Sequence, residues 1–135
     1  MNEENTKRLY HEFPRLYRER ENDSLMRWGF SCSDGWFRLV YDLSAAIESR
    51  ARELGLDPES DEWPKVVQVK EKFGSLSFYT RAVHQSILDL IVEAQSRSGH
   101  ICEQCGLPGE WRTKTGWYHT SCDRCENKIK AGEGR

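Results

Sequence analysis

Four of the five cysteines form two Cys-x2-Cys pairs, Cys102 with Cys105 and Cys122 with Cys125. The sixteen residues between the pairs match the spacing at which one metal ion closes the loop. Each pair can hold an ion from one tight turn, and two pairs complete a tetrahedron with metal–sulfur distances of about 2.3 Å. We therefore predict one structural zinc ion bound by all four thiolates.

Other uses of four cysteines fit the sequence less well. A disulfide framework needs an oxidising compartment, and the opening MNEENTKRLYHEF has no apolar run that would predict a secretion signal. A redox pair normally accompanies a thioredoxin-like βαβ unit, which the sequence does not suggest. His100 and His119 are near enough to replace a cysteine as ligand, but four well-spaced thiolates are already present. Four thiolates also leave no open metal position for catalysis.

The residues around the cysteines predict the local fold of residues 100–131. Gly106 suits the first knuckle, because the position after the second thiolate often needs a backbone that only glycine adopts cheaply. Short aromatic segments on either side of Gly116 predict a small hairpin, and Thr120 or Ser121 is expected to cap a helix that begins at the second pair. Knuckle, hairpin and helix in this order resemble a treble-clef or zinc-ribbon module, which implies metal binding and no particular function.

The rest of the chain predicts an α+β body over residues 1–99, with the metal module docked on it. Helices are expected where apolar residues recur at helical spacing, and a hairpin where they alternate. Because a two-stranded ribbon is not stable alone, helices should cover its apolar face. The linker to the module is short, which argues for docking. The predicted elements are helices over 5–21 (broken near Pro14), 35–54 and 84–98, a hairpin over 65–81, the metal module over 100–131 and a disordered tail over 132–135.

The predicted hairpin turns at Gly74-Ser75, because glycine suits the first position of a two-residue turn. That register places Phe73 opposite Leu76 and Val69 opposite Thr80, with Phe73 on the apolar face. The other face would either contact phosphates and stack a base or protect the sheet edge from aggregation. Its basic and aromatic residues are Lys70, Lys72, Tyr79 and Arg81.

Large apolar residues are concentrated in LMRWGFSCSDGW, residues 25–36. We expect Trp28, Phe30 and Trp36 to be buried, because tryptophan and phenylalanine exposed together are costly in a soluble protein. Cys32 is expected to be a small buried apolar residue, since the local sequence supplies no base that would activate a thiol. The acidic segment over 53–62 is expected to be a solvated connector.

Composition limits the classes of partner. The chain of 135 residues has a formal net charge of −2, and four thiolates with one divalent zinc ion would make it more negative. This argues against a protein that coats nucleic acid through overall positive charge. No stretch approaches the roughly 20 apolar residues of a membrane-spanning helix, so we expect no membrane partner and a cytoplasmic location.

The sequence predicts a non-enzymatic protein without a small-molecule substrate. It contains no phosphate-binding loop, no nucleophile motif and no closely spaced acid pair. A minor alternative is a metal-dependent nuclease of the ββα-metal type, which also uses paired Cys-x2-Cys motifs. His119 and Asn127 fit that pattern, but the second histidine expected on the helix is missing.

The remaining prediction is that the chain binds a macromolecule. The metal module holds more large aromatic residues than it can bury, and Trp, Tyr and Arg are the residues that anchor protein interfaces. A protein partner is therefore predicted, and nucleic acid is the alternative, bound by the module and the basic face of the hairpin. The predicted partner-binding residues are Trp111, Arg112, Lys114, Trp117, Tyr118, Lys70, Lys72, Tyr79 and Arg81.

The segments VKEKFGSLSFY and CEQCGLPGEW, together with the closing CDRC, resemble a group of small proteins of bacteria and their phages. The resemblance covers residues 69–79 and the metal module, and extends to the region from Trp28 to Trp36. It implies no particular activity. A phage association would imply a protein that binds a host protein, as an inhibitor or modulator of a defence or gene-expression machine.

Overall fold

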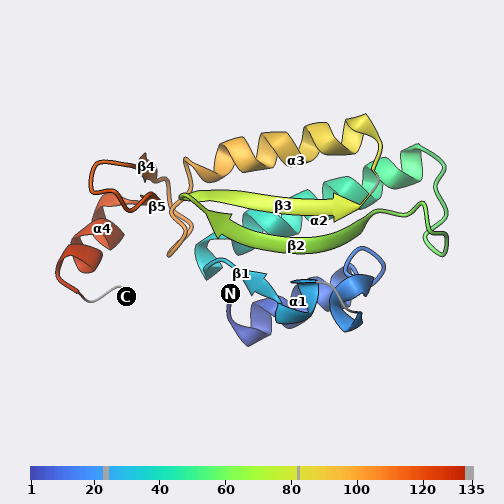
Figure 1. The fold of residues 1–135 in the computed structure, drawn as a ribbon, viewed down its shortest axis with the longest axis horizontal. Helices are drawn as coiled ribbons and strands as arrows, with labels where there is room; N and C mark the ends of the chain where they lie inside the picture. The colour runs from blue at the N-terminus through green and yellow to red at the C-terminus, as the bar shows by residue number, and fades with distance from the viewer. Residues whose placement is uncertain (23–24, 82, 133–135) are drawn as a thin grey trace.

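A computed structural model describes residues 1–22, 25–81 and 83–132 of the chain. The fold is α+β, as the sequence predicts: two long helices lie along a β-hairpin, and a small module with four cysteines lies at the turn of that hairpin (Figure 1). The predicted tail over 132–135 lies outside the described residues except for Gly132. Its N–H donates to Ile129 O at 2.9 Å, in the turn that ends the last helix.

The order of the elements places the hairpin strands between the two long helices along the chain. Four α-helices, three short 3-10 helices and five strands are found in the described part of the chain. They are α1 (Glu3–Glu12), η1 (Arg18–Glu21), η2 (Leu25–Trp28), β1 (Phe30–Ser31), η3 (Asp34–Trp36), α2 (Phe37–Glu53), β2 (Lys65–Lys72), β3 (Ser75–Arg81), α3 (Gln85–Ser98), β4 (Glu110–Arg112), β5 (His119–Ser121) and α4 (Asp123–Lys130).

The first predicted helix is shorter than 5–21. It begins earlier, after Asn2, whose side chain accepts the Asn5 N–H at 2.8 Å, and it ends at Glu12. It ends there because a proline at position 14 disfavours helical backbone in the residue before it. One 3-10 turn, η1, follows after a gap. The apolar residues of this segment are buried nonetheless: Leu9, Phe13, Leu16 and Tyr17.

The core lies between α2, α3 and one face of the hairpin. Helical spacing brings apolar residues of each helix onto one side, as in an amphipathic helix. Burying a side chain of this size stabilises the fold by about 1.5–3 kcal/mol. The main buried residues of this layer are Val40, Leu43 and Ile47 from α2, Ile87 and Ile91 from α3, and Val66, Val69, Leu76 and Phe78 from the hairpin.

The predicted register of the hairpin is wrong by two residues. Lys72 pairs with Ser75, so the turn is Phe73-Gly74, and Val69 lies opposite Phe78 instead of Thr80. Both turn residues have positive φ, 54° for Phe73 and 85° for Gly74, as a two-residue turn of type I′ requires. The prediction failed because a bulky residue rarely adopts this left-handed conformation, so the sequence argument placed Gly74 first in the turn.

The faces of the hairpin differ from the prediction at two points. A bulge between Val66 and Gln68 shifts the alternation, so that Val66 is buried and Val67 is only partly covered. Phe73, predicted on the apolar face, is 69% exposed at the tip of the turn. The polar outer face is otherwise as predicted near the turn, and it includes Lys70 and Lys72.

Both long edges of the hairpin have neighbours. The strand β1 pairs in parallel with β2, a contact between distant segments that the sequence did not indicate. Along β3, the backbone N–H groups of Leu76 and Phe78 donate to the side chains of Ser98 and Gln95 on α3, at 2.9 and 3.0 Å. Neighbours of this kind reduce the number of backbone groups that are open to another strand. A role of the basic outer face in edge protection stays a prediction.

The apolar segment over 25–36 is only partly buried: Met26 and Cys32 are covered by the core, whereas Leu25 is exposed. Phe30 and Trp36 are buried, but Trp28 is 71% exposed, which makes the prediction of burial wrong for that residue. The Arg27 guanidinium lies over the Trp28 ring, 5.1 Å from its centroid. Cys32 is buried as predicted, and burial raises the pKa of its thiol to about 12.

Candidate metal centre

The first cysteine pair lies on a backbone knuckle that follows α3. The N–H of Cys102 donates to Leu107 O at 2.8 Å, and the N–H of Gly106 returns to Cys102 O at 2.9 Å. Gly106 has a φ of 82°, the left-handed conformation that the sequence predicted for this position and that glycine adopts without a steric penalty. The knuckle therefore turns Cys102 and Cys105 toward the same point.

The second pair lies at the start of α4. Cys122 is the N-cap, and its Sγ accepts the N–H of Cys125 at 3.4 Å. The predicted caps, Thr120 and Ser121, are wrong because both residues belong to β5. Their hydroxyl groups donate elsewhere, from Thr120 to Gly74 O at 2.7 Å and from Ser121 to Glu126 Oε1 at 2.9 Å.

The four sulfur atoms fit one tetrahedral metal ion. All four Sγ atoms lie within 4.8 Å of one another. The Sγ atoms of Cys105 and Cys122 are 3.7 Å apart, and a tetrahedron with metal–sulfur bonds of about 2.3 Å has sulfur atoms about 3.8 Å apart. Sulfur donors alone, without oxygen ligands, suit zinc and other thiophilic metals and not magnesium or calcium. The predicted ligand set is thus brought together and is compatible with zinc.

The thiols of this cluster have divergent acidities. The backbone N–H of Cys125 lowers the pKa of Cys122 to about 7. Desolvation, followed by the neighbouring thiols, raises the pKa of Cys125 to about 12. Four thiolates in one place repel each other, so they ionise together only beside a cation. A divalent metal ion supplies that charge and releases protons as it binds.

Both ring nitrogens of His119 contact other residues of the module, so His119 is not a metal ligand. Its side chain is 6% exposed. Its Nε2 lies 2.6 Å from Glu126 Oε1, and its Nδ1 lies 2.9 Å from Trp117 O. Both ring nitrogens therefore face acceptors within the module. His100, the other histidine considered as a ligand, is exposed and does not belong to the four-cysteine cluster.

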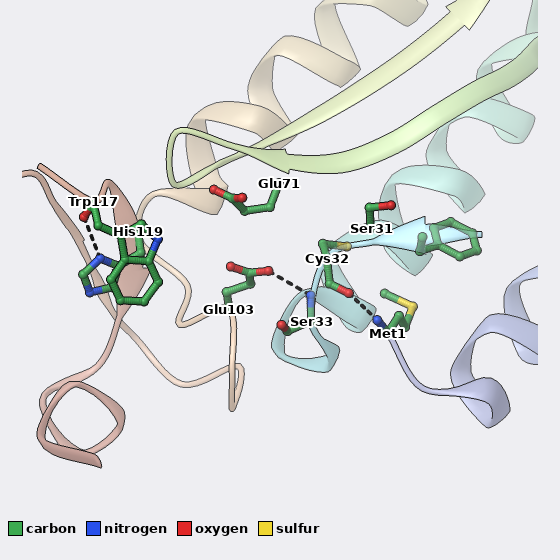
Figure 2. Close-up of a pocket in the computed structure, with 9 residues that line it drawn as sticks. Met1, Ser31, Cys32, Ser33, Glu71, Glu103, Trp117 and His119 are labelled. Atoms are coloured by element: carbon green, nitrogen blue, oxygen red, sulfur yellow. Dashed lines mark hydrogen bonds between the residues drawn. The ribbon is translucent and has the colours of Figure 1, made fainter. Parts of the chain in front are cut away.

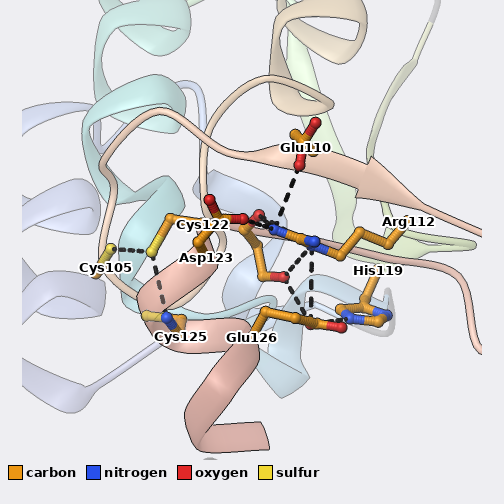
Figure 3. Close-up of polar contacts among 9 residues, drawn as sticks. Cys105, Glu110, Arg112, His119, Cys122, Asp123, Cys125 and Glu126 are labelled. Carbon is orange, nitrogen blue, oxygen red and sulfur yellow. Dashed lines mark hydrogen bonds and ion pairs between the residues drawn. The ribbon is translucent and has the colours of Figure 1, made fainter. Parts of the chain in front are cut away.

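One face of the β4–β5 ribbon packs on α4 through a polar network (Figure 3). The guanidinium of Arg112 donates from Nη2 to Asp123 Oδ1 at 3.0 Å and from Nε to Ser121 Oγ at 2.9 Å. Desolvation opposes ionisation of Glu126, but hydrogen bonds from His119 and Ser121, with the charge of Arg112 nearby, hold its pKa below the usual range. The network orients α4, and with it Cys125.

The opposite face of the ribbon contacts the hairpin turn. Trp111 and Thr120 form a cross-strand pair on this face. The indole Nε1 of Trp111 donates to Phe73 O at 2.8 Å, and Thr120 Oγ1 donates to Gly74 O. A Cβ on Gly74 would lie 2.8 Å from His119 N and from the Trp111 ring, so only glycine fits here.

A second set of contacts joins the cysteine knuckle to the start of α2. The N–H of Gly35 donates to Glu103 O at 2.7 Å, and the indole of Trp36 donates to Ile101 O at 2.8 Å. Gly35 approaches the knuckle so closely that a Cβ would lie 2.3 Å from Cys102 O. The metal-binding segment is thus held from two sides by the rest of the chain.

A pocket of about 320 Å³ separates the knuckle from the end of β1 (Figure 2). Glu71 and Glu103 both face it, and the Ser33 N–H donates to Glu103 Oε2 at 2.9 Å. Burial raises the pKa of Glu103; the Ser33 N–H opposes this rise, and the charge of Glu71 adds to it. The main-chain amine of Met1 donates to Cys32 O at the other end of the pocket. Two carboxylates make this side of the module unfavourable for phosphate groups.

The predicted partner-binding residues fall into separate groups. Trp111 and Tyr118 are 51% and 40% exposed and pack edge to face with centroids 5.7 Å apart. Trp117 is partly exposed and stacks on His119 at 3.9 Å, and Lys114 is exposed on the loop after β4. Lys72 is exposed beside the turn. Trp111, Trp117, Tyr118 and Lys72 lie near the junction of hairpin and module, whereas Lys114 lines a pocket on the α4 side of the ribbon.

The other predicted partner-binding residues are placed differently. Arg112 is bound within the polar network that orients α4. Tyr79 and Arg81 lie toward the far end of β3, and at about 3.3 Å per residue Arg81 is roughly 20 Å from the turn. Lys70 lies two residues from Lys72 on the same face. Sequence reasoning missed Phe73, which a turn at Phe73-Gly74 would have placed at the tip.

Fold and site together define an α+β protein with a C-terminal four-cysteine metal module. No protein-family model, curated protein or solved structure matches the chain. Among the described residues, no helix combines the length and the apolar character that crossing a membrane requires.

Proposed function

We propose that the chain is a non-enzymatic zinc protein that binds another protein through exposed aromatic side chains of its metal module. One observation supports this above the others. Trp111, Trp117 and Tyr118 are all exposed by 40% or more, yet each is held in place by a hydrogen bond or a ring contact. Rigid aromatic side chains are typical anchors of protein interfaces, because little side-chain freedom is lost on binding.

The geometry around His119 supports a non-enzymatic role. A nuclease of the ββα-metal type would need this imidazole to accept a proton from water. Here Nδ1 and Nε2 each face an acceptor inside the module, and the ring is buried beneath Trp117. Asn127, the other residue considered for that activity, is exposed on α4. Plasmid cleavage that needs a metal ion and is lost in His119→Ala would contradict this view.

The proposed role against a host protein rests only on the resemblance of the sequence motifs to small proteins of bacteria and their phages. We expect the partner to belong to a defence or gene-expression machine, which the chain would inhibit or modulate. The formal net charge of −2 is compatible with a specific protein surface and unsuited to general phosphate binding.

Affinity capture from bacterial lysate tests the proposal. The baits are the zinc-loaded wild type, the double variant Trp117→Ala/Tyr118→Ala and the control Trp28→Ala, which removes an exposed aromatic side chain outside the module. A specific partner should be retained by the wild type and the control and lost from the double variant, and the purified pair should then bind directly. Equal capture by all three baits would refute the role of the aromatic residues, provided that zinc content and unfolding temperature show the double variant to be folded.

Nucleic acid is the second candidate partner, favoured by one specific observation. Both edges of the hairpin have neighbours along part of their length, at Val69 and Lys70 in β2 and at Leu76 and Phe78 in β3. These neighbours reduce the need for Lys70 and Lys72 as edge protection. With Tyr79 the two lysines form a basic and aromatic face that suits a single strand. Micromolar binding of labelled oligonucleotides that weakens steeply with salt and is lost in Lys70→Glu/Lys72→Glu would favour this function.

A further inference from the structure

In the turn Phe73-Gly74, a bulky residue occupies a position that bulky residues rarely occupy. Phe73 has a φ of 54°, a conformation that Asn, Asp and Gly fill in such turns and bulky residues rarely adopt. Burial does not compensate for this, because the side chain is 69% exposed in the described structure. A residue that conflicts with its backbone and gains no packing within the fold is typical of a functional site.

The metal module fixes this turn in place. The carbonyl of Phe73 accepts the Trp111 indole N–H, and the carbonyl of Gly74 accepts the Thr120 hydroxyl. Trp111 in turn packs against Tyr118. We call Phe73, Trp111 and Tyr118 the aromatic tip. Its three side chains are exposed. Hydrogen bonds hold the backbone of the turn, and a ring contact holds Trp111 against Tyr118, so the tip is preorganised for binding.

The sheet face beside the aromatic tip is positively charged without compensation. Lys70 and Lys72 lie on it, and neither ammonium group has an ion-pair partner within the described part of the chain. The strand register places no carboxylate on the face. Its residues are Ser31, Gln68, Lys70, Lys72, Ser75, Ser77 and Tyr79. On a chain of negative formal charge, such a face attracts carboxylates of a partner.

We infer that Phe73 is the central anchor of the partner-binding surface, and that the partner protein offers it an apolar pocket bordered by carboxylates. This inference rests on the proposed protein-binding function and adds the docking residue and the chemistry of the partner. A single ring at the end of a rigid turn fits a pocket better than it fits a continuous stack of bases. The Glu71 carboxylate accepts the Gly74 N–H at 2.7 Å and lines one pocket with Glu103. Two carboxylates beside the turn also disfavour a nucleic-acid strand wrapping around the tip.

Selection of binders from a displayed library of small folded domains tests this surface directly, without knowledge of the natural partner. Each domain has a randomised concave face in which acidic and basic residues are encoded equally. Domains that bind the zinc-loaded wild type are selected. Recovered binders should combine an apolar pocket with acidic residues at its rim. Phe73→Asn should weaken them about tenfold or more, as expected for an interface anchor, and Lys70→Glu/Lys72→Glu should weaken them as well.

The variants separate binding from folding. Asparagine tolerates positive φ, so Phe73→Asn should keep or raise the unfolding temperature. The control Trp28→Asn removes an exposed ring outside the aromatic tip and should leave affinity unchanged. Failure to recover binders, binders without acidic residues, or binders insensitive to Phe73→Asn would each overturn the inference. Binders lost in Tyr118→Ala but retained in Phe73→Asn would leave the proposed function standing and remove Phe73 as the anchor. Displacement of the binders by labelled oligothymidine would assign the surface to nucleic acid and overturn the inference too.

Discussion

Gly35→Ala should destabilise the protein strongly, although Gly35 lies far from the metal ligands in sequence. The added Cβ would lie 2.3 Å from Cys102 O and 2.4 Å from Glu103 O. Both atoms belong to the backbone of the knuckle and cannot rotate away. The knuckle must therefore move, which costs about 1–3 kcal/mol for overpacking. The bonds from Gly35 to Glu103 and from Trp36 to Ile101 would weaken, at about 1 kcal/mol each.

We therefore expect a loss of about 3–5 kcal/mol in the free energy of unfolding and a fall of roughly 15 °C in Tm. Urea and thermal unfolding, followed by circular dichroism in excess zinc, measure both. Gly99→Ala is the matched control, because neither glycine has a positive φ and a Cβ at Gly99 makes only ordinary contacts, with the nearest atom at 3.7 Å. It should change the free energy of unfolding by no more than about 1 kcal/mol. If Gly35→Ala costs no more than this control, the close approach of η3 to the knuckle is refuted.

Three further predictions concern the metal, the polar network and a buried carboxylate. Cys102→Ser should lower zinc stoichiometry below one per chain by elemental analysis and unfold the module, as should chelation of the wild type; metal-free folded protein with a stoichiometric disulfide would contradict this. Glu126→Gln should cost about 1–3 kcal/mol in urea unfolding, because it removes the charged acceptor of His119, Ser121 and Arg112, and zinc should stay bound. Burial raises the pKa of Glu48 although Arg52 opposes the rise, so its ionisation destabilises the folded state. The free energy of unfolding of the wild type should therefore fall, relative to that of Glu48→Gln, as pH rises. The fall should begin near the ordinary glutamate pKa and end above the raised pKa of the folded state. A stability difference that is the same at about pH 4.5 and pH 7.5 would argue against this assignment.

The metal ligands were predictable because their signal is local. Each Cys-x2-Cys pair fixes two ligands within one turn of chain, and Gly106 marks the conformation that the first knuckle needs. The long helices were predictable for a similar reason, since periodic apolar residues record which face is buried. The parallel strand β1 was not predictable. Two residues are too few to show an alternating pattern, and their partners Val69 and Lys70 are distant in the sequence.

The errors at the candidate binding surface have physical causes. Sequence rules assume that each residue adopts a backbone conformation that suits it, and Phe73 does not. The prediction that Trp28 is buried has a different cause: it assumed that large apolar side chains avoid water, and the structure leaves this one exposed. Arg112 stays a predicted partner-binding residue. Its ion pairs with Asp123 and Glu126 were not predictable, because these residues lie on a helix whose packing the sequence alone did not define.

The contact between the hairpin turn and the metal module has a consequence for the order of folding. The bond from Thr120 to Gly74 joins residues 46 positions apart, and the bond from Trp111 to Phe73 joins residues 38 apart. Closing loops of this length is entropically slow, so local turns and helices form first. During synthesis the hairpin leaves the ribosome before the second cysteine pair exists. We therefore expect the Phe73-Gly74 turn to gain these two hydrogen bonds only after the C-terminal residues have been made.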